Sequence, residues 1–192
     1  MRAAEKPFIV NFYQTILKKK KIPHIKLREP GGSRNSEIIR KLILNNQSNF
    51  NKNTDLLLYL ASRSENINML KKLYNKKIII IDRFIDSTIA YQHYGLGVDL
   101  RLINKINSYL LGNFKINFTF LNTVSIKNMN KRLKKRKKLN RYDKFDVKFY
   151  KKVQQGFIKL SKNKKNYQII NSNLKIEFNK KIVIKKIDKL IK

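Results

Sequence analysis

A charged, glycine-rich segment at residues 28–33 is the first place where this sequence could contact a ligand. It reads Arg-Glu-Pro-Gly-Gly-Ser, and Arg40 follows shortly after it. A proline followed by two glycines forms a tight turn whose backbone is open to close approach by a ligand. Arg28 and Glu29 add opposite charges at the entry to that turn. The segment predicts a ligand-contacting turn, and an ordinary turn between a strand and a helix is the alternative.

A second pair of residues could recognise an aromatic ligand. Tyr59 and Arg63 are four residues apart in a segment with helical character, so they would share one face of a helix. An aromatic ring beside a guanidinium can stack on a nucleobase and donate hydrogen bonds to its edge. The alternative is core packing combined with a surface charge.

Asp82 and Arg83 directly follow the aliphatic run at residues 78–81. A carboxylate at the end of a buried strand can hold Mg²⁺ or its water ligands, and an adjacent guanidinium can clamp phosphate. A buried ion pair is the alternative interpretation. Hydroxyl, phenol and amide groups follow within ten residues, at Ser87, Thr88, Tyr91 and Gln92.

Three arginines are spaced along a strongly basic segment. Arg132 and Arg136 are expected one turn apart on one face of a helix, and Arg141 follows in the sequence Asn-Arg-Tyr-Asp. By themselves, these three residues are also compatible with a solvated basic helix.

The net charge of +33 raises the question of a nucleic-acid partner. Only ten of the 45 basic residues are arginine, and the favoured residue types Lys, Ile and Asn share A/T-rich codons. A biased genome therefore explains the basic surface without a polyanionic partner. No RNA- or DNA-binding motif is found, so we expect no specific nucleic-acid ligand. Arginine in so lysine-rich a chain indicates positions where a planar, bidentate donor is required.

Composition excludes several classes of protein. The chain has no cysteine, which excludes disulfides and Cys-ligated metals. Its longest aliphatic run, residues 78–81, is far shorter than the ~20 residues of a membrane helix. The first residues lack the apolar stretch and cleavage site of a signal peptide. With 42% hydrophobic residues the chain can bury a core, so we expect one domain over 1–192.

Periodicity predicts an alternation of strands and helices, which is typical of an α/β fold: a parallel sheet in a three-layer arrangement with helices on both faces. In such sheets ligands bind beyond the carboxyl ends of the strands, where the polar clusters described above fall. Strands are expected at 22–27, 77–82, 116–121 and 167–170, and helices at 8–21, 37–44, 54–74, 99–111, 126–138, 146–161 and 179–192.

Taken together, these segments resemble bacterial thymidylate kinase, a member of the P-loop nucleoside monophosphate kinases. The chain carries REPGGS, LLLYLASR, DRF and STIAYQHYGLG in the order of that family, followed by a lid segment at about 130–145. The resemblance covers 8–170. Tyr59 stands where the family has Phe, and Asn140 and Asp143 replace more usual lid acids.

The resemblance implies a binding site for dTMP. Arg40 and Arg83 would grip its phosphate, Tyr59 would stack on thymine, and Arg63 would bond the base carbonyl. The substrate-binding residues implied in this way are Arg28, Glu29, Arg40, Tyr59, Arg63, Ser87, Thr88, Tyr91 and Gln92.

Further roles follow from the same resemblance. Thr88 and Gln92 would fix the base edge, and Tyr91 would pack at the sugar 2′ position. Asp82 would organise Mg²⁺, and the lid arginines would close over ATP, which is the co-substrate. The implied catalytic residues are Asp82, Arg83, Arg132, Arg136 and Arg141.

The start of the chain departs from the family. A phosphate-binding loop needs G-x-x-x-x-G-K-[ST] after a buried strand, but the first glycine is Gly31. Only Lys6 stands near the position of the loop lysine, and Pro7 occupies that of the Ser or Thr. We therefore expect the first strand and the glycine-rich loop to be absent. One set of codons for the first residues gives Glu-Gly-Cys-Gly-Lys-Thr in another frame, which suggests a frame slip before Phe8, with an unrelated extension as the alternative.

Three functions are compatible with these observations. The first is phosphoryl transfer from ATP to dTMP, giving dTDP, by an enzyme that the resemblance implies to be cytoplasmic and homodimeric. The second is a catalytically impaired remnant that only binds nucleotide. The third, a basic nucleic-acid-binding protein, has no motif in its favour.

Overall fold

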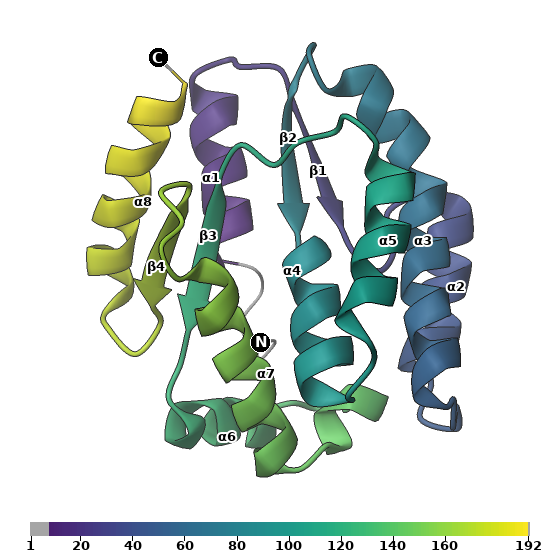
Figure 1. Cartoon of the computed structure of the whole chain (residues 1–192). Helices are drawn as coiled ribbons and strands as arrows, with labels where there is room; N and C mark the ends of the chain where they lie inside the picture. The colour runs from purple at the N-terminus through teal and green to yellow at the C-terminus, as the bar shows by residue number, and fades with distance from the viewer. Residues whose placement is uncertain (1–7, 192) are drawn as a thin grey trace.

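The computed structural model describes residues 8–191 and contains helices and short strands in alternation (Figure 1). Lys6 and Pro7 lie outside the described residues. The strands are β1 (His24–Arg28), β2 (Ile78–Asp82), β3 (Thr119–Thr123) and β4 (Tyr167–Asn171). The helices are α1 (Phe8–Lys19), α2 (Arg34–Leu44), α3 (Lys52–Leu73), α4 (Ile85–Thr88), the π-helix η1 (Ile89–Gly95), α5 (Leu100–Leu111), α6 (Ile126–Lys134), the 3-10 helix η2 (Arg141–Lys144), α7 (Val147–Ser161) and α8 (Ile176–Leu190).

The described strands form two parallel pairs, β1 with β2 and β3 with β4. The arrows of both pairs point the same way in Figure 1. This arrangement confirms the predicted α/β fold with parallel strands. Within residues 8–191 no strand joins β2 to β3, so the sheet is divided in the middle.

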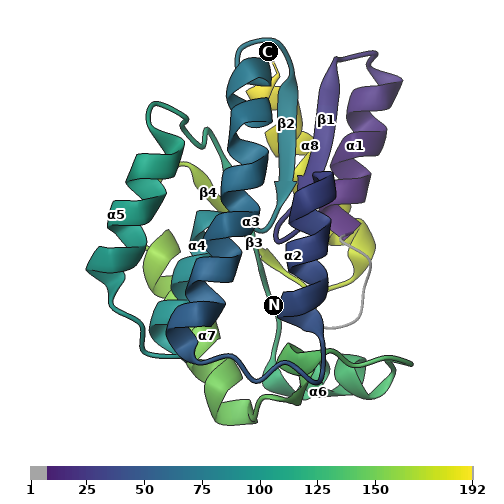
Figure 2. The ribbon, with the colours of Figure 1, turned by 90° about the vertical axis from the view of Figure 1, so that its right-hand side faces the viewer.

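Helices cover both sides of the strands. On one side α1 and α8 lie together, with Ile9 of α1, Ile170 of β4 and Val183 of α8 in one buried cluster. On the other side α3 and α5 pack against β1, where Leu27 and Leu70 are buried. Figure 2 shows α2, α3 and α5 side by side on that face. None of the helices in the described part of the chain is long and apolar enough to cross a membrane.

Side-chain caps fix several helix starts. Ser33 accepts a hydrogen bond from the backbone N–H of Ser36, so α2 begins at Arg34, earlier than its apolar periodicity predicts. Asn51, Asp99, Ser125 and Asp146 cap the starts of α3, α5, α6 and α7 in the same way.

Two expected elements end elsewhere than predicted. The helix expected at 126–138 stops at Lys134, so Arg136 lies beyond α6 and does not share a helical face with Arg132. That expectation was wrong, because continued Lys and Arg residues carry no signal for a helix end. The strand expected at 116–121 is β3, which starts three residues later at Thr119.

Helix α7 packs closely on η1 at two glycines. A Cβ atom on Gly156 would come within 2.5 Å of the Tyr94 ring, and one on Gly95 within 2.6 Å of the Phe149 ring. Glycine therefore permits two helices to approach each other at a distance that any larger residue would prevent.

We predict that Gly156→Ala lowers stability despite its better helix propensity. Alanine gains about 1 kcal/mol in a helix interior, but overpacking against Tyr94 costs ~1–3 kcal/mol. Rotation of the ring would not relieve the overlap, because the added atom would also lie 2.9 Å from the Tyr94 Cβ atom. Urea unfolding should show a net loss. Lys152→Ala, on the exposed face of the same helix, should change stability by less than about 0.5 kcal/mol. A Gly156→Ala protein as stable as the parent would contradict this packing argument.

Candidate active site

Several of the residues singled out in the sequence meet at one pocket beyond the carboxyl ends of β1 and β2. Glu29, Arg40, Tyr59, Arg83 and Tyr91 line it from one side. The enclosed volume is about 40 Å³, much less than the ~300 Å³ or more of a small-molecule site. A nucleotide can therefore enter only if part of the wall moves. The wall opposite these residues comes from the lid segment and contains Asn140, Tyr142 and Asp143.

The turn after β1 is held by two buried hydroxyl groups and by a carboxylate near the surface. Gly31 and Gly32 have φ angles of 114° and 118°, which only glycine adopts readily. The Gly31 N–H donates to the Ser36 and Ser62 hydroxyls, at 3.1 and 3.0 Å, and the Gly32 N–H donates to Glu37 at 2.9 Å. The sequence prediction of a tight turn is confirmed, and the turn is locked onto α2 and α3.

Arg63 lies at the centre of a buried network and does not line the pocket. Its guanidinium donates to Glu29 at 2.9 Å, to Asn107 at 2.5 Å and to Thr88 at 3.0 Å. Its exposed fraction is 1%. Burial raises the pKa of the Glu29 carboxyl, and the Arg63 charge opposes that rise. In this structure the network leaves Arg63 facing protein acceptors and away from the pocket.

Arg83 follows β2 in a left-handed conformation, with φ of 68°. Its guanidinium lies over the Tyr91 ring, 4.4 Å from the ring centre. Burial acts to lower the pKa of Arg83, but Tyr91, Tyr59 and Asp82 hold it above its ordinary value, so the group stays charged. Arg40 reaches the same pocket from α2, and its guanidinium donates to the Pro30 carbonyl at 2.6 Å.

Tyr59 and Tyr91 give the pocket an aromatic wall. Both rings lie edge-on to Tyr142, at centre distances of 6.0 and 5.9 Å. Burial raises the pKa of Tyr59 to about 12, so its hydroxyl is protonated at neutral pH. A flat, neutral ring next to a guanidinium suits stacking on a base.

The polar residues of the 87–92 segment lie on α4 and η1. Thr88 is buried and accepts a hydrogen bond from Arg63. Gln92 is fully buried; its amide donates to the Tyr142 hydroxyl at 3.3 Å, while its Oε1 atom has no partner. A π-helix widens the backbone locally, and such segments are frequent at functional sites. Ser87 faces a different cavity, between β2 and β3.

The lid arginines are paired with acids. Arg136 donates to Asp143 at 2.5 Å, and Arg141 forms an ion pair with Asp55 of α3. The Tyr142 hydroxyl also donates to Asp55. Arg132 points elsewhere, to the Ser172 carbonyl at 2.8 Å. None of the three arginines lines the pocket. Arg136 pairs with Asp143, which does line it, and Arg141 lies between the lining residues Asn140 and Tyr142 in the sequence, whereas Arg132 contacts neither.

Sequence reasoning missed Asp55 and Tyr142. Asp55 is four residues before Tyr59 and thus on the same face of α3, a spacing that could have identified it. Tyr142 lies inside the lid motif, between Arg141 and Asp143. Its contact with α3 joins residues 87 positions apart, and no local sequence pattern predicts that contact.

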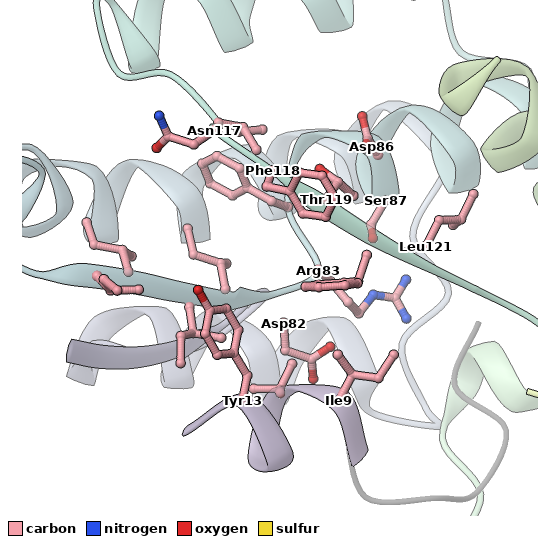
Figure 3. Close-up of a pocket in the computed structure, with 18 of the residues that line it drawn as sticks. Ile9, Tyr13, Asp82, Arg83, Asp86, Ser87, Asn117, Phe118, Thr119 and Leu121 are labelled. Carbon is pink, nitrogen blue, oxygen red and sulfur yellow. The ribbon is translucent and has the colours of Figure 1, made fainter. Parts of the chain in front are cut away.

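Asp82 ends β2, paired in register with Arg28 at the end of β1. The Glu29 N–H donates to the Asp82 carbonyl at 3.0 Å, which fixes the two strand ends side by side. Figure 3 shows Asp82 and Arg83 at one end of the cavity between β2 and β3. Among the described residues no group of three acidic or histidine side chains gathers around Asp82 or elsewhere. Arg28 itself pairs with Glu37 at the surface.

These features define a class of protein. A parallel α/β fold with a cationic, aromatic pocket at the carboxyl ends of its strands, covered by an arginine-bearing segment, is typical of enzymes that bind phosphate esters and transfer phosphoryl groups.

Comparison with known proteins identifies the family within that class. The sequence model described as Thymidylate kinase matches residues 6–183, so the chain belongs to the thymidylate kinase family. A thymidylate kinase of Kosmotoga olearia is 29% identical over 171 residues, covering 88% of this chain and 82% of the relative. One from Wolbachia pipientis is 42% identical over 132 residues, covering 68% and 64%.

A solved structure agrees with the family assignment. The crystal structure of thymidylate kinase from Ehrlichia chaffeensis superposes with a TM-score of 0.77 at 28% identity, covering 98% of this chain and 94% of that one. The predicted family and fold are thereby confirmed.

We predict that Arg63→Met destabilises the protein strongly. Removing one partner of a buried ion pair leaves the Glu29 carboxyl uncompensated, at a cost of about 3–5 kcal/mol. Arg28→Met breaks the exposed pair with Glu37 and should cost at most ~1 kcal/mol. Urea unfolding of both variants measures the difference.

The pH dependence supplies a further test of the same pair. Without Arg63 the pKa of Glu29 in the folded state should rise further above its unfolded value. The variant should then be most stable in acid and lose stability as the pH rises through that raised pKa, whereas the parent should lose less. Equal losses in Arg63→Met and Arg28→Met would contradict the central role of the pair.

Proposed function

We propose that this chain binds dTMP in the pocket between β1, β2, α3 and the lid segment, and transfers the γ-phosphoryl group of ATP to it, giving ADP and dTDP. The observation that carries the proposal is the convergence of two guanidinium groups and two aromatic rings, from Arg40, Arg83, Tyr59 and Tyr91, on one pocket. Two guanidinium groups can bind a phosphate, and aromatic rings can stack on a nucleobase.

The division of roles within the pocket follows from what each group already contacts. Arg40 and Arg83 place their guanidinium groups at the pocket wall and would bind the 5′-phosphate. Tyr59 would stack on thymine, and the unpartnered Gln92 Oε1 could accept a hydrogen bond from the N3–H of the base. Arg63 would act by positioning Glu29 and Thr88, since its donors are directed at protein groups.

The lid segment would open and close over the nucleotide. Its Arg136 and Arg141 are held by Asp143 and Asp55, and a phosphate would compete with those carboxylates for the same donors. Transfer of a phosphoryl group needs positive charge at the migrating group, and Arg136 and Arg141 are the groups that can supply it.

Magnesium, the assembly and the cellular site are parts of the same proposal. Mg²⁺, bound through water and the ATP phosphates, would neutralise charge on the phosphoryl group, and Asp82 is the carboxylate that would hold it.

A homodimer is supported by exposed apolar residues on neighbouring helices, Ile38 and Leu42 of α2 and Leu57 of α3. A cytoplasmic location would match the pool of nucleotide substrates.

We predict that the chain binds dTMP, and that Arg40→Met weakens this binding at least ~10-fold. Charge-assisted hydrogen bonds contribute about 1.5–3 kcal/mol each, and the methionine variant would lack the hydrogen bond from Arg40 to the phosphate. Calorimetry with dTMP and with thymidine separates the two parts of the ligand. The variant should lose affinity for dTMP but not for thymidine. Arg101→Met, in an exposed surface pair on α5, is the matched control and should bind like the parent.

A second prediction concerns the binding of ATP, the phosphoryl donor. The 192 residues contain no G-x-x-x-x-G-K-[ST] sequence. Backbone N–H groups of such a loop align and stabilise the transferred phosphoryl group, and loss of one such donor costs about 100-fold or more in rate. We expect the 192-residue chain to bind dTMP more tightly than ATP and to turn over at least ~100-fold below the ~1–100 s⁻¹ of kinases. Ordinary turnover in a coupled assay would show that the phosphates of ATP are held by other groups.

A further inference from the structure

The first turn of α3 carries a buried carboxylate that contacts the lid segment. The side chain of Asp55 is only 3% exposed. One of its oxygens accepts a hydrogen bond from the Arg141 guanidinium and the other accepts one from the Tyr142 hydroxyl. A carboxylate removed from water needs such partners, because burying an unpaired charge is costly. Asp55 therefore uses both of its oxygens to hold two neighbouring residues of the lid.

Two further contacts join the lid to the chain just before Asp55. The Asn46 side-chain amide donates to the Leu139 carbonyl at 2.9 Å, and the Arg141 guanidinium lies over the Phe50 ring, 5.5 Å from its centre. In Figure 2 the loop between α2 and α3 runs next to the lid segment. The bonds to Asp55 are the charged ones among these contacts and are largely shielded from water, so they should contribute most to keeping the lid closed.

The Tyr142 ring enters the nucleotide pocket from the lid side. It lies edge-on to Tyr59 and Tyr91, at the ring-centre distances given above, and its hydroxyl accepts from the Gln92 amide at 3.3 Å. These aromatic rings and this amide are the groups that the proposed function assigns to the nucleoside. The Tyr142 ring and a thymine base would therefore compete for the same part of the pocket.

The Tyr142 hydroxyl is a donor at neutral pH. Burial raises its pKa well above the ordinary value, and the nearby Tyr59 and Asp55 raise the pKa further. A protonated phenol can donate to the Asp55 carboxylate and accept from the Gln92 amide at the same time. The contact between the lid and α3 therefore persists under the conditions in which a nucleotide kinase works.

The other end of the same stretch is attached to α7. The Tyr142 carbonyl accepts from the Tyr150 hydroxyl at 2.7 Å, and the Tyr142 N–H donates to the Asn140 side chain at 2.9 Å. Neither bond involves Asp55. Loss of the Asp55 contacts should therefore let the lid segment swing away from α3 while it stays joined to α7.

We propose that Asp55 is a latch that holds Tyr142 in the place of the thymine base, so that the free chain is closed and dTMP binds only after the Tyr142 ring is displaced. Asp55 is then a positioning residue that acts through Tyr142 and Arg141. The inference rests on the proposed function, because it takes the pocket as the site of the base. When only a fraction of the molecules is open, the apparent affinity for a ligand falls by that fraction.

The position of the lid can be measured without nucleotide. The chain has no cysteine, so Gln47→Cys and Lys138→Cys, both at exposed positions, can carry nitroxide labels on the two sides of the contact between Asn46 and Leu139. Strong dipolar coupling between the labels reports a closed lid. Asp55→Asn in this background should raise the ratio of open to closed molecules at least ~10-fold, because hydrogen bonds to a buried charge are among the stronger ones.

Thymidine tests whether Tyr142 competes with the base, since thymidine has no phosphate to bind the arginines. Calorimetry should show at least ~5-fold tighter thymidine binding for Asp55→Asn and for Tyr142→Phe, because both variants raise the open fraction. Tyr142→Phe keeps the ring and the Asp55 carboxylate, so it tests the latch even if Asp55→Asn folds poorly. Asp188→Asn, in an exposed pair with Lys20, and Tyr109→Phe, at a residue that is 85% exposed, are the matched controls and should behave like the parent.

Two results would overturn the proposal. Unchanged dipolar coupling in Asp55→Asn would show that the carboxylate does not hold the lid. An opened lid with equal or weaker thymidine binding would show that Tyr142 is not a competitor of the base. If neither the parent nor any variant binds thymidine or dTMP, the proposed function fails, and the coupling between the labels alone decides whether Asp55 closes the lid.

Discussion

The buried ion pair between Arg63 and Glu29 is the interaction on which the pocket depends. Arg63 extends from α3 and joins three other segments: the turn after β1 through Glu29, the start of the π-helix through Thr88, and α5 through Asn107. Two of these segments then present pocket residues. The Pro30 carbonyl next to Glu29 accepts from Arg40, and the π-helix carries Tyr91. Arg63 therefore positions the aromatic and cationic residues of the pocket although it does not line the pocket itself.

Much of the fold could be predicted because its signals are local. Aliphatic runs followed by polar residues indicate parallel strands. Apolar residues that recur at helical spacing over seven or more positions indicate the helices that cover the sheet. The details that failed depend on contacts between distant residues. Helix α6 ends before Arg136, whose guanidinium pairs with Asp143. The π-helix at residues 89–95 has no composition signal, and its last residue, Gly95, lies against the Phe149 ring of α7.

The site was predictable in its residue types and only partly in its contacts. Arg40, Tyr59, Arg83 and Tyr91 converge as the motifs indicate, because the ends of neighbouring parallel strands lie at one edge. The contacts that these residues and their neighbours make with the lid segment were not predictable. The contact of Asp55 with the lid joins positions 86 residues apart and has no trace in sequence spacing. Whether an arginine faces a ligand or a buried acid is decided by such partners, so Arg63 could not be distinguished from Arg83 by motif alone.

The same reasoning explains why arginine persists at these positions in a chain dominated by lysine. Arg63 donates to three acceptors that lie in different directions and belong to three separate segments. A planar guanidinium with five donors can satisfy them together, whereas a lysine ammonium at the end of a flexible stem is a compact point charge. Burial adds to this requirement, because a buried lysine loses its proton more readily and an arginine does not. The lysines elsewhere are mostly solvated and need no such geometry, so a shift in composition can add them freely at the surface while leaving the arginines of the core and the pocket in place.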